Sequence, residues 1–270
     1  MVVLSAGYWV TTFVAILSSI YTILMCWYIL NRYTLQQKAW KKLEYQMILL
    51  RVFFDALTSV LSLIYFLIST YTFRNPDSLS FDVPFLIGIA SSSFVEMRSY
   101  LAVVIAIERA FATVFPVQFF RYRKSVSNIP IVGFVISTGI ALVVVMFWVC
   151  ELKLPLADGC TNFNCAAPRC YQVYHAVSVS IYSSLNALFS LILCLKLLML
   201  SFKHVNLNAD FRKPNLLSLT DGLSSLIFEM VPAVLFAKGI IDFTGIGPIF
   251  GALRLTGRGV ETTVMAKLMQ

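Results

Sequence analysis

The residues best suited to chemistry in this sequence are charged side chains that interrupt long apolar segments. Arg51 and Asp55 lie four positions apart, so they share one face of a helix and can form an ion pair. A charge inside an apolar helix is costly and is usually paired or functional. Two interpretations stay open: an ion pair within one helix near the membrane interface, or a polar network in which Asp55 meets the third and seventh apolar segments.

Two further groups of charges lie in apolar surroundings. Glu96 and Arg98 are two positions apart and point in different directions on a helix. Arg254 and Arg258 share one helix face, and Glu261 follows three residues later. We expect this face to look inward. Glu96 or Arg98 would meet one of these residues across a bundle or line a ligand cavity.

The other reactive residues form no recognisable catalytic or metal site. His175 and His204 belong to no HExxH motif or paired cluster. The stretch GIGPIF from Gly245 lacks the aspartate of an intramembrane aspartyl protease, and neither a GxSxG motif nor a phosphate loop occurs. We therefore expect no enzyme, no cofactor and no metal.

Four cysteines gather in one stretch between apolar segments: Cys150, Cys160, Cys165 and Cys170. No histidine or CxxC spacing supports zinc, so we expect disulfides, with free thiols as the alternative, and the sequence leaves all three pairings open. Cys26 and Cys194 lie inside apolar segments and are expected to be inert packing residues.

The composition places most of this chain in a lipid bilayer. Of its 270 residues, 59% are hydrophobic and 13% charged, whereas a soluble domain carries about a quarter charged residues. The net charge of +8 comes from short basic runs between apolar segments, which suits cytoplasmic loops better than a nucleic-acid surface. The sequence predicts a polytopic membrane protein.

Seven apolar segments can be marked, and together they predict one all-α seven-helix bundle spanning residues 1–270. They cover residues 8–30, 46–71, 85–107, 129–150, 171–200, 216–237 and 245–268. The seventh is the least apolar because it contains three charges and several glycines. Lysine and arginine concentrate in the loops after the first, third and fifth segments, so we expect an external N-terminus and a cytoplasmic C-terminus.

The inner end of the third segment carries a distinctive run of residues. An acid–arginine pair is followed by a Phe-Pro step and a basic loop, in the order Glu108, Arg109, Phe115, Pro116, Arg121 and Arg123. In the sixth segment, Pro232 removes a backbone hydrogen bond and predicts a kink. That kink is either a tolerated membrane proline or a hinge for movement of the inner half.

Two stretches carry a family resemblance. RSYLAVVIAIERAFATVFPVQFFRYR (Arg98–Arg123) resembles the third helix and second inner loop of nematode serpentine chemoreceptors, most closely the class Srbc. GPIFGALRLTGRGVETTVMAKLM (Gly247–Met269) is similar to the seventh helix of that class.

The resemblance implies a G-protein-coupled chemosensory receptor in the plasma membrane of sensory neurons. Its partners would be a small external ligand, membrane lipid and a cytoplasmic heterotrimeric G protein. Glu108 would hold Arg109 at rest, and Arg109 would then contact the G protein. Asp55 corresponds loosely to the aspartate of the second helix, and Pro232 to the proline of the sixth.

The chain departs from rhodopsin-like receptors at three places. Residues 81–86 contain no cysteine, EMVP replaces CWxP around Pro232, and NPxxY is absent from the last segment. A rhodopsin-like activation mechanism therefore cannot be copied in detail. The alternatives to a signalling receptor are a seven-span ligand-gated channel, a small transporter, or a receptor-derived protein that no longer signals.

Overall fold

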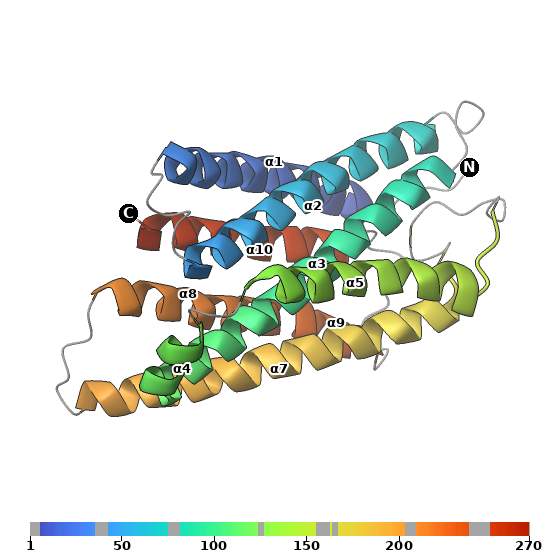
Figure 1. The fold of residues 1–270 in the computed structure, drawn as a ribbon. Helices are drawn as coiled ribbons and strands as arrows, with labels where there is room; N and C mark the ends of the chain where they lie inside the picture. The colour runs from blue at the N-terminus through green and yellow to red at the C-terminus, as the bar shows by residue number, and fades with distance from the viewer. Residues whose placement is uncertain are drawn as a thin grey trace.

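The computed structural model describes residues 6–35, 43–74, 82–123, 127–154, 163, 167–202, 209–237 and 249–269. Within these ranges the chain is helical and contains no strand. The long helices lie beside one another as a bundle (Figure 1). A helix satisfies its own backbone hydrogen bonds, which is the requirement for crossing a bilayer.

Seven helical units make up the described bundle. Five of them are long and apolar enough to span a membrane: α1 (Ala6–Leu35), α2 (Leu43–Arg74), α3 (Asp82–Val114), α5 (Ile129–Val144) with its extension η1 (Val145–Val149), and α7 (Arg169–Phe202). The sixth unit is α8 (Ala209–Ser225), η2 (Leu226–Met230) and α9 (Val231–Ala237), and the seventh is α10 (Ile249–Met269).

The observed helices differ from the predicted segments mainly at their ends. α3 continues to Val114, two turns beyond the predicted end at residue 107, so Glu108 and Arg109 lie within the helix. A charge ends an apolar stretch but does not interrupt the backbone hydrogen bonds. The sixth unit starts earlier than predicted, at Ala209. Residues 245–248 of the predicted seventh segment lie outside the described residues.

Helix α3 lies at the centre of the bundle. In its apolar stretch 67% of the residues are buried, against 28% in α1 and 22% in α5. Many of its buried residues are small, including Ser91, Ala102 and Ala106. Small residues let neighbouring membrane helices approach closely. The charges on α3 therefore face protein on several sides.

The sixth unit changes its helical winding just before Pro232. The N–H of Val231 bonds to the carbonyl of Leu226, five residues back, which is the pattern of a π-helix. Proline has no N–H to give to the preceding turn, and such π segments often occur at functional sites. Glu229 lies in this segment and is buried. The kink predicted at Pro232 thus coincides with a local π turn.

Helix α10 comes very close to this π turn. A Cβ placed on Gly257 would lie 2.6 Å from Cγ of Phe228, closer than packed atoms can approach. Ser224 of α8 also donates a hydrogen bond to the carbonyl of Gly257, at 3.4 Å. The lack of a side chain at Gly257 therefore lets α10 bring its arginines beside η2.

A disulfide joins Cys150, just after η1, to Cys170 in the first turn of α7. Of the pairings that the sequence left open, this one ties two neighbouring spans together at one end of the bundle. Cys160 and Cys165 lie outside the described residues. Cys26 and Cys194 are free thiols within α1 and α7.

Candidate functional site

A single guanidinium at the middle of α3 reaches acids from several helices. Arg98 is 2% exposed, and its Nε donates a hydrogen bond to Oδ1 of Asp55 on α2, at 3.0 Å. Its Nη2 lies 3.5 Å from Oδ1 of Asp221 on α8 and also pairs with Glu261 on α10. Its Nη1 lies 3.9 Å from Oε1 of Glu229. Arg98 therefore links α3 to α2, to the sixth unit and to α10 through their buried acids.

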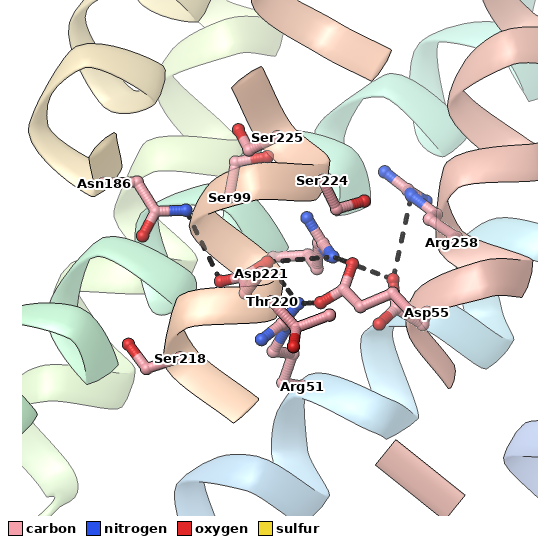
Figure 2. A network of polar contacts seen from close by, with 12 residues as sticks. Arg51, Asp55, Ser99, Asn186, Ser218, Thr220, Asp221, Ser224, Ser225 and Arg258 are labelled. Carbon is pink, nitrogen blue, oxygen red and sulfur yellow. Dashed lines mark hydrogen bonds and ion pairs between the residues drawn. The ribbon is translucent and has the colours of Figure 1, made fainter. Parts of the chain in front are cut away.

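A second arginine shares two of these acids. Nη2 of Arg51 on α2 lies 2.5 Å from Oδ1 of Asp221 and forms an ion pair with Glu261. Figure 2 shows the Arg51 and Asp221 side chains pointing toward one another. Arg51 and Asp55, predicted to share one face of α2, both lie in this cluster. Their printed ion pairs run to other helices, so the structure favours the network over a pair within one helix.

The inward face of α10 supplies two more cations. Nε of Arg258 lies 3.7 Å from Oδ1 of Asp55, as the dashed line in Figure 2 shows. The Arg258 side chain is buried, and its three guanidinium nitrogens make no hydrogen bond to the described residues. Nε of Arg254, one turn earlier, lies 3.9 Å from Oε1 of Glu229. The spacing of Arg254, Arg258 and Glu261 correctly indicated one common face.

The cluster contains equal numbers of opposite charges. We call it the charge network and define it by eight residues: Arg51, Asp55, Arg98, Asp221, Glu229, Arg254, Arg258 and Glu261. Burying a charge costs several kcal/mol (on the order of 3–5) unless a partner compensates it. Asn186 of α7 adds a hydrogen bond from its Nδ2 to Oδ2 of Asp221, at 3.4 Å. Five of the seven helical units thus contribute to the network.

Two of its acids, Asp221 and Glu229, were not among the residues that the sequence analysis selected. A usable signal was present, because both acids interrupt the sixth apolar segment. Four arginines in the other apolar segments also outnumber the three acids there, Asp55, Glu96 and Glu261. Counting charges over all segments would have pointed to both acids.

Glu96 lies on a different side of α3 from Arg98, as their spacing predicted. Its Oε1 accepts a hydrogen bond from Oγ of Ser178 on α7. Arg98 therefore belongs to the charge network, whereas Glu96 faces the neighbouring helix α7.

A second polar group lies at the C-terminal end of α3. Oε1 of Glu108 pairs with Nε of Arg123 at 2.6 Å, in the short helix α4 (Pro116–Arg123). Nη2 of Arg123 donates to Oδ1 of Asn128, at 2.5 Å. Nδ2 of Asn128 in turn donates to Oε1 of Gln46 on α2, at 3.1 Å. This chain of contacts fastens α4 to α2 and α3.

The other residues predicted for coupling surround this group. Arg109 is buried in α3, at 3% exposure. Phe115 and Pro116 are exposed where α3 passes into α4, and Arg121 is exposed on α4. The structure therefore gathers the predicted coupling residues at one end of α3, about three turns from Arg98.

Comparison with known proteins gives one family. The model of the family described as "Serpentine type 7TM GPCR chemoreceptor Srbc" matches residues 4–270, which is nearly the whole chain. None of the curated proteins matches this chain.

Replacing Arg98 with leucine should destabilise the protein strongly. The change leaves Asp55 and Glu261 with one cation fewer, so we expect the free energy of unfolding to fall by about 3–5 kcal/mol. Chemical unfolding in detergent measures it. The matched control is the double variant Arg98→Leu/Glu261→Leu, which keeps the charges balanced and should recover much of the loss. A single variant as stable as the unaltered protein would contradict the network.

Proposed function

Since this chain belongs to the Srbc family of serpentine seven-transmembrane GPCR chemoreceptors, as its third and seventh helices predicted, we propose that it detects an environmental small molecule and signals to a G protein. The family also confirms the all-α, multi-pass seven-helix fold. The ligand would bind from outside, and a heterotrimeric G protein would bind the cytoplasmic face. We place the receptor in the plasma membrane, in sensory cilia by resemblance.

The observation that carries this proposal is the sharing of acids between Arg51 and Arg98. Asp221 of α8 and Glu261 of α10 each contact both arginines. Moving α8 away from α3 must therefore break ion pairs inside a low-dielectric bundle, which makes intermediate positions costly. Such a group has few stable arrangements, as a switch requires.

A second arrangement is available within the same residues. Arg258 lies 3.7 Å from Asp55 without hydrogen-bonding it, so it can take over Asp55 if Arg98 turns away. A ligand would drive this exchange only by binding the exchanged state more tightly. The π turn before Pro232 would supply the hinge for the inner half of the sixth unit.

At the inner face we assign coupling to the group around α4. Displacement of α8 would expose Arg109 to the G protein beside Phe115, Pro116 and the basic residues of α4. The contact between Glu108 and Arg123 would hold α4 in its resting position. We also propose that residues 1–270 form a single domain.

The orientation that we propose has the N-terminus outside and the C-terminus in the cytoplasm. Helix α1 begins, and α10 ends, at opposite ends of the bundle (Figure 1). The disulfide between Cys150 and Cys170 lies at the end where α1 begins, and disulfides persist in oxidising compartments. The described basic residues Arg32, Arg121 and Arg123, at the end of α1 and on α4, lie at the other end, as expected of residues near cytoplasmic loops.

Tags at both termini test this orientation. We expect an N-terminal tag to be stained in intact cells and a C-terminal tag only after permeabilisation, because an odd number of spans separates them. The reverse pattern would place Arg109 on the external side. It would rule out the coupling mechanism and favour the channel interpretation.

Replacing Arg109 with alanine should abolish ligand-evoked G-protein activation. The variant lacks the cation assigned to the G-protein contact, whereas a ligand that enters from outside would bind toward the other end of α3. Nucleotide exchange on a co-expressed G protein is the measurement, with surface staining to verify expression. Arg74→Ala, at the far end of α2, is the matched control and should signal normally. Normal signalling by Arg109→Ala would refute the assignment.

A further inference from the structure

One buried acid stands outside the charge network. Glu96 is 1% exposed, and its Oε2 makes no hydrogen bond to the described residues. Among the described residues, the only hydrogen bond to the Glu96 carboxylate comes from Oγ of Ser178. The other buried acids that the structure describes, Asp55, Asp221, Glu229 and Glu261, all lie within 4.0 Å of an arginine nitrogen. Glu96 has no such partner.

The arginines of the charge network already have acidic partners. The charge network already balances its four arginines with four acids, and Arg254, which acts electrostatically on Glu96, lies beside Glu229. Arg109 follows Glu96 by thirteen residues on the same helix, which corresponds to about 20 Å. Among the described residues Glu96 forms no ion pair, so its carboxyl group is left to bind a proton or the cation of a ligand.

The surroundings of Glu96 suit an organic cation. Oγ of Ser178, its hydrogen-bond donor, also lies 3.4 Å from the hydroxyl of Tyr100. The ring of Tyr100 packs edge-on against Tyr182, with 6.0 Å between centroids. Tyr174 lies one turn before Ser178 on α7, and the centroid of its ring is 6.5 Å from that of Tyr171. Tyrosine rings attract ammonium groups through their negative faces.

A further buried atom without a hydrogen bond to the described residues belongs to α7, about one turn before Ser178. Nδ1 of His175 is buried and makes no hydrogen bond to the described residues. Its ring stacks on Tyr171, with 5.9 Å between centroids. Glu96, His175 and the tyrosines thus combine unused polar atoms with aromatic surface, which is the composition of a small-molecule site.

We propose that this receptor recognises an organic amine, and that Glu96 binds its ammonium group. The carboxylate accepts hydrogen bonds from the ammonium N–H groups, and Tyr100, Tyr171, Tyr174 and Tyr182 pack against the hydrocarbon part. This inference rests on the proposed receptor function and adds the chemical class of the ligand. In the opposing interpretation Glu96 is a protonated structural acid that only bonds Ser178.

The test measures binding to the purified full-length receptor by thermal stabilisation in detergent. The probes are a series of primary arylalkyl amines, including phenethylamine, and the alcohol of the same shape for each. We expect at least one amine to stabilise the receptor at concentrations where its alcohol does not. Glu96→Gln, which keeps the shape and removes the charge, should weaken that amine about tenfold or more.

Two controls make the result decisive. Glu151→Gln removes an exposed acid and should bind the amine normally, whereas Glu96→Asp keeps the charge and should retain part of the affinity. Glu96→Gln should itself fold, because it removes an unpaired buried charge. The proposal is overturned if no amine stabilises the receptor, if amines and alcohols act alike, or if Glu96→Gln binds as tightly as the unaltered protein.

Nucleotide exchange on the G protein separates this inference from the receptor function. Amine binding that depends on Glu96 but evokes no exchange supports the site and contradicts the signalling role. Exchange evoked only by uncharged compounds, unaltered in Glu96→Gln, supports signalling and overturns the amine assignment.

Discussion

The requirement that a charge inside the bilayer have a partner determines how this bundle is built. Arg98 meets it by contacting acids on α2, α8, η2 and α10 at once. Each of those helices is therefore held by an interaction that cannot be replaced by water or lipid. Moving one helix away would leave a buried charge without its partner. Breaking a buried ion pair in this way costs about 3–5 kcal/mol of stability. The helices must rearrange together or not at all.

The same constraint explains why the sixth unit is irregular. Its acids Asp221 and Glu229 lie eight residues apart and both must face the arginines. The π turn that contains Glu229 shifts the helix register just before Pro232. Gly257 lets α10 pack directly against that turn. The irregular part of the helix therefore carries a buried acid of the charge network, which is a suitable arrangement for a hinge.

Local features of this fold could be predicted from sequence, and long-range pairings could not. Apolar runs located the helices, and helical spacing correctly separated Glu96 from Arg98 and placed Arg254 and Arg258 on one face. The partner of Arg51, however, is 170 residues away at Asp221. Several acids could neutralise each arginine equally well, so the choice depends on how the helices cross. The pairing of Cys150 with Cys170 was undetermined for the same reason.

The distance between the C-terminal end of α3 and the N-terminal half of α8 tests most directly whether the charge network holds the resting state. Spin labels on Phe111→Cys and Leu216→Cys, two exposed positions, would report it after Cys26, Cys160, Cys165 and Cys194 are replaced by serine, which leaves the disulfide between Cys150 and Cys170. Our account predicts that Asp221→Asn, without any ligand, adds a population at longer distance. An unchanged distance distribution in Asp221→Asn would show that the network does not hold α8 against α3.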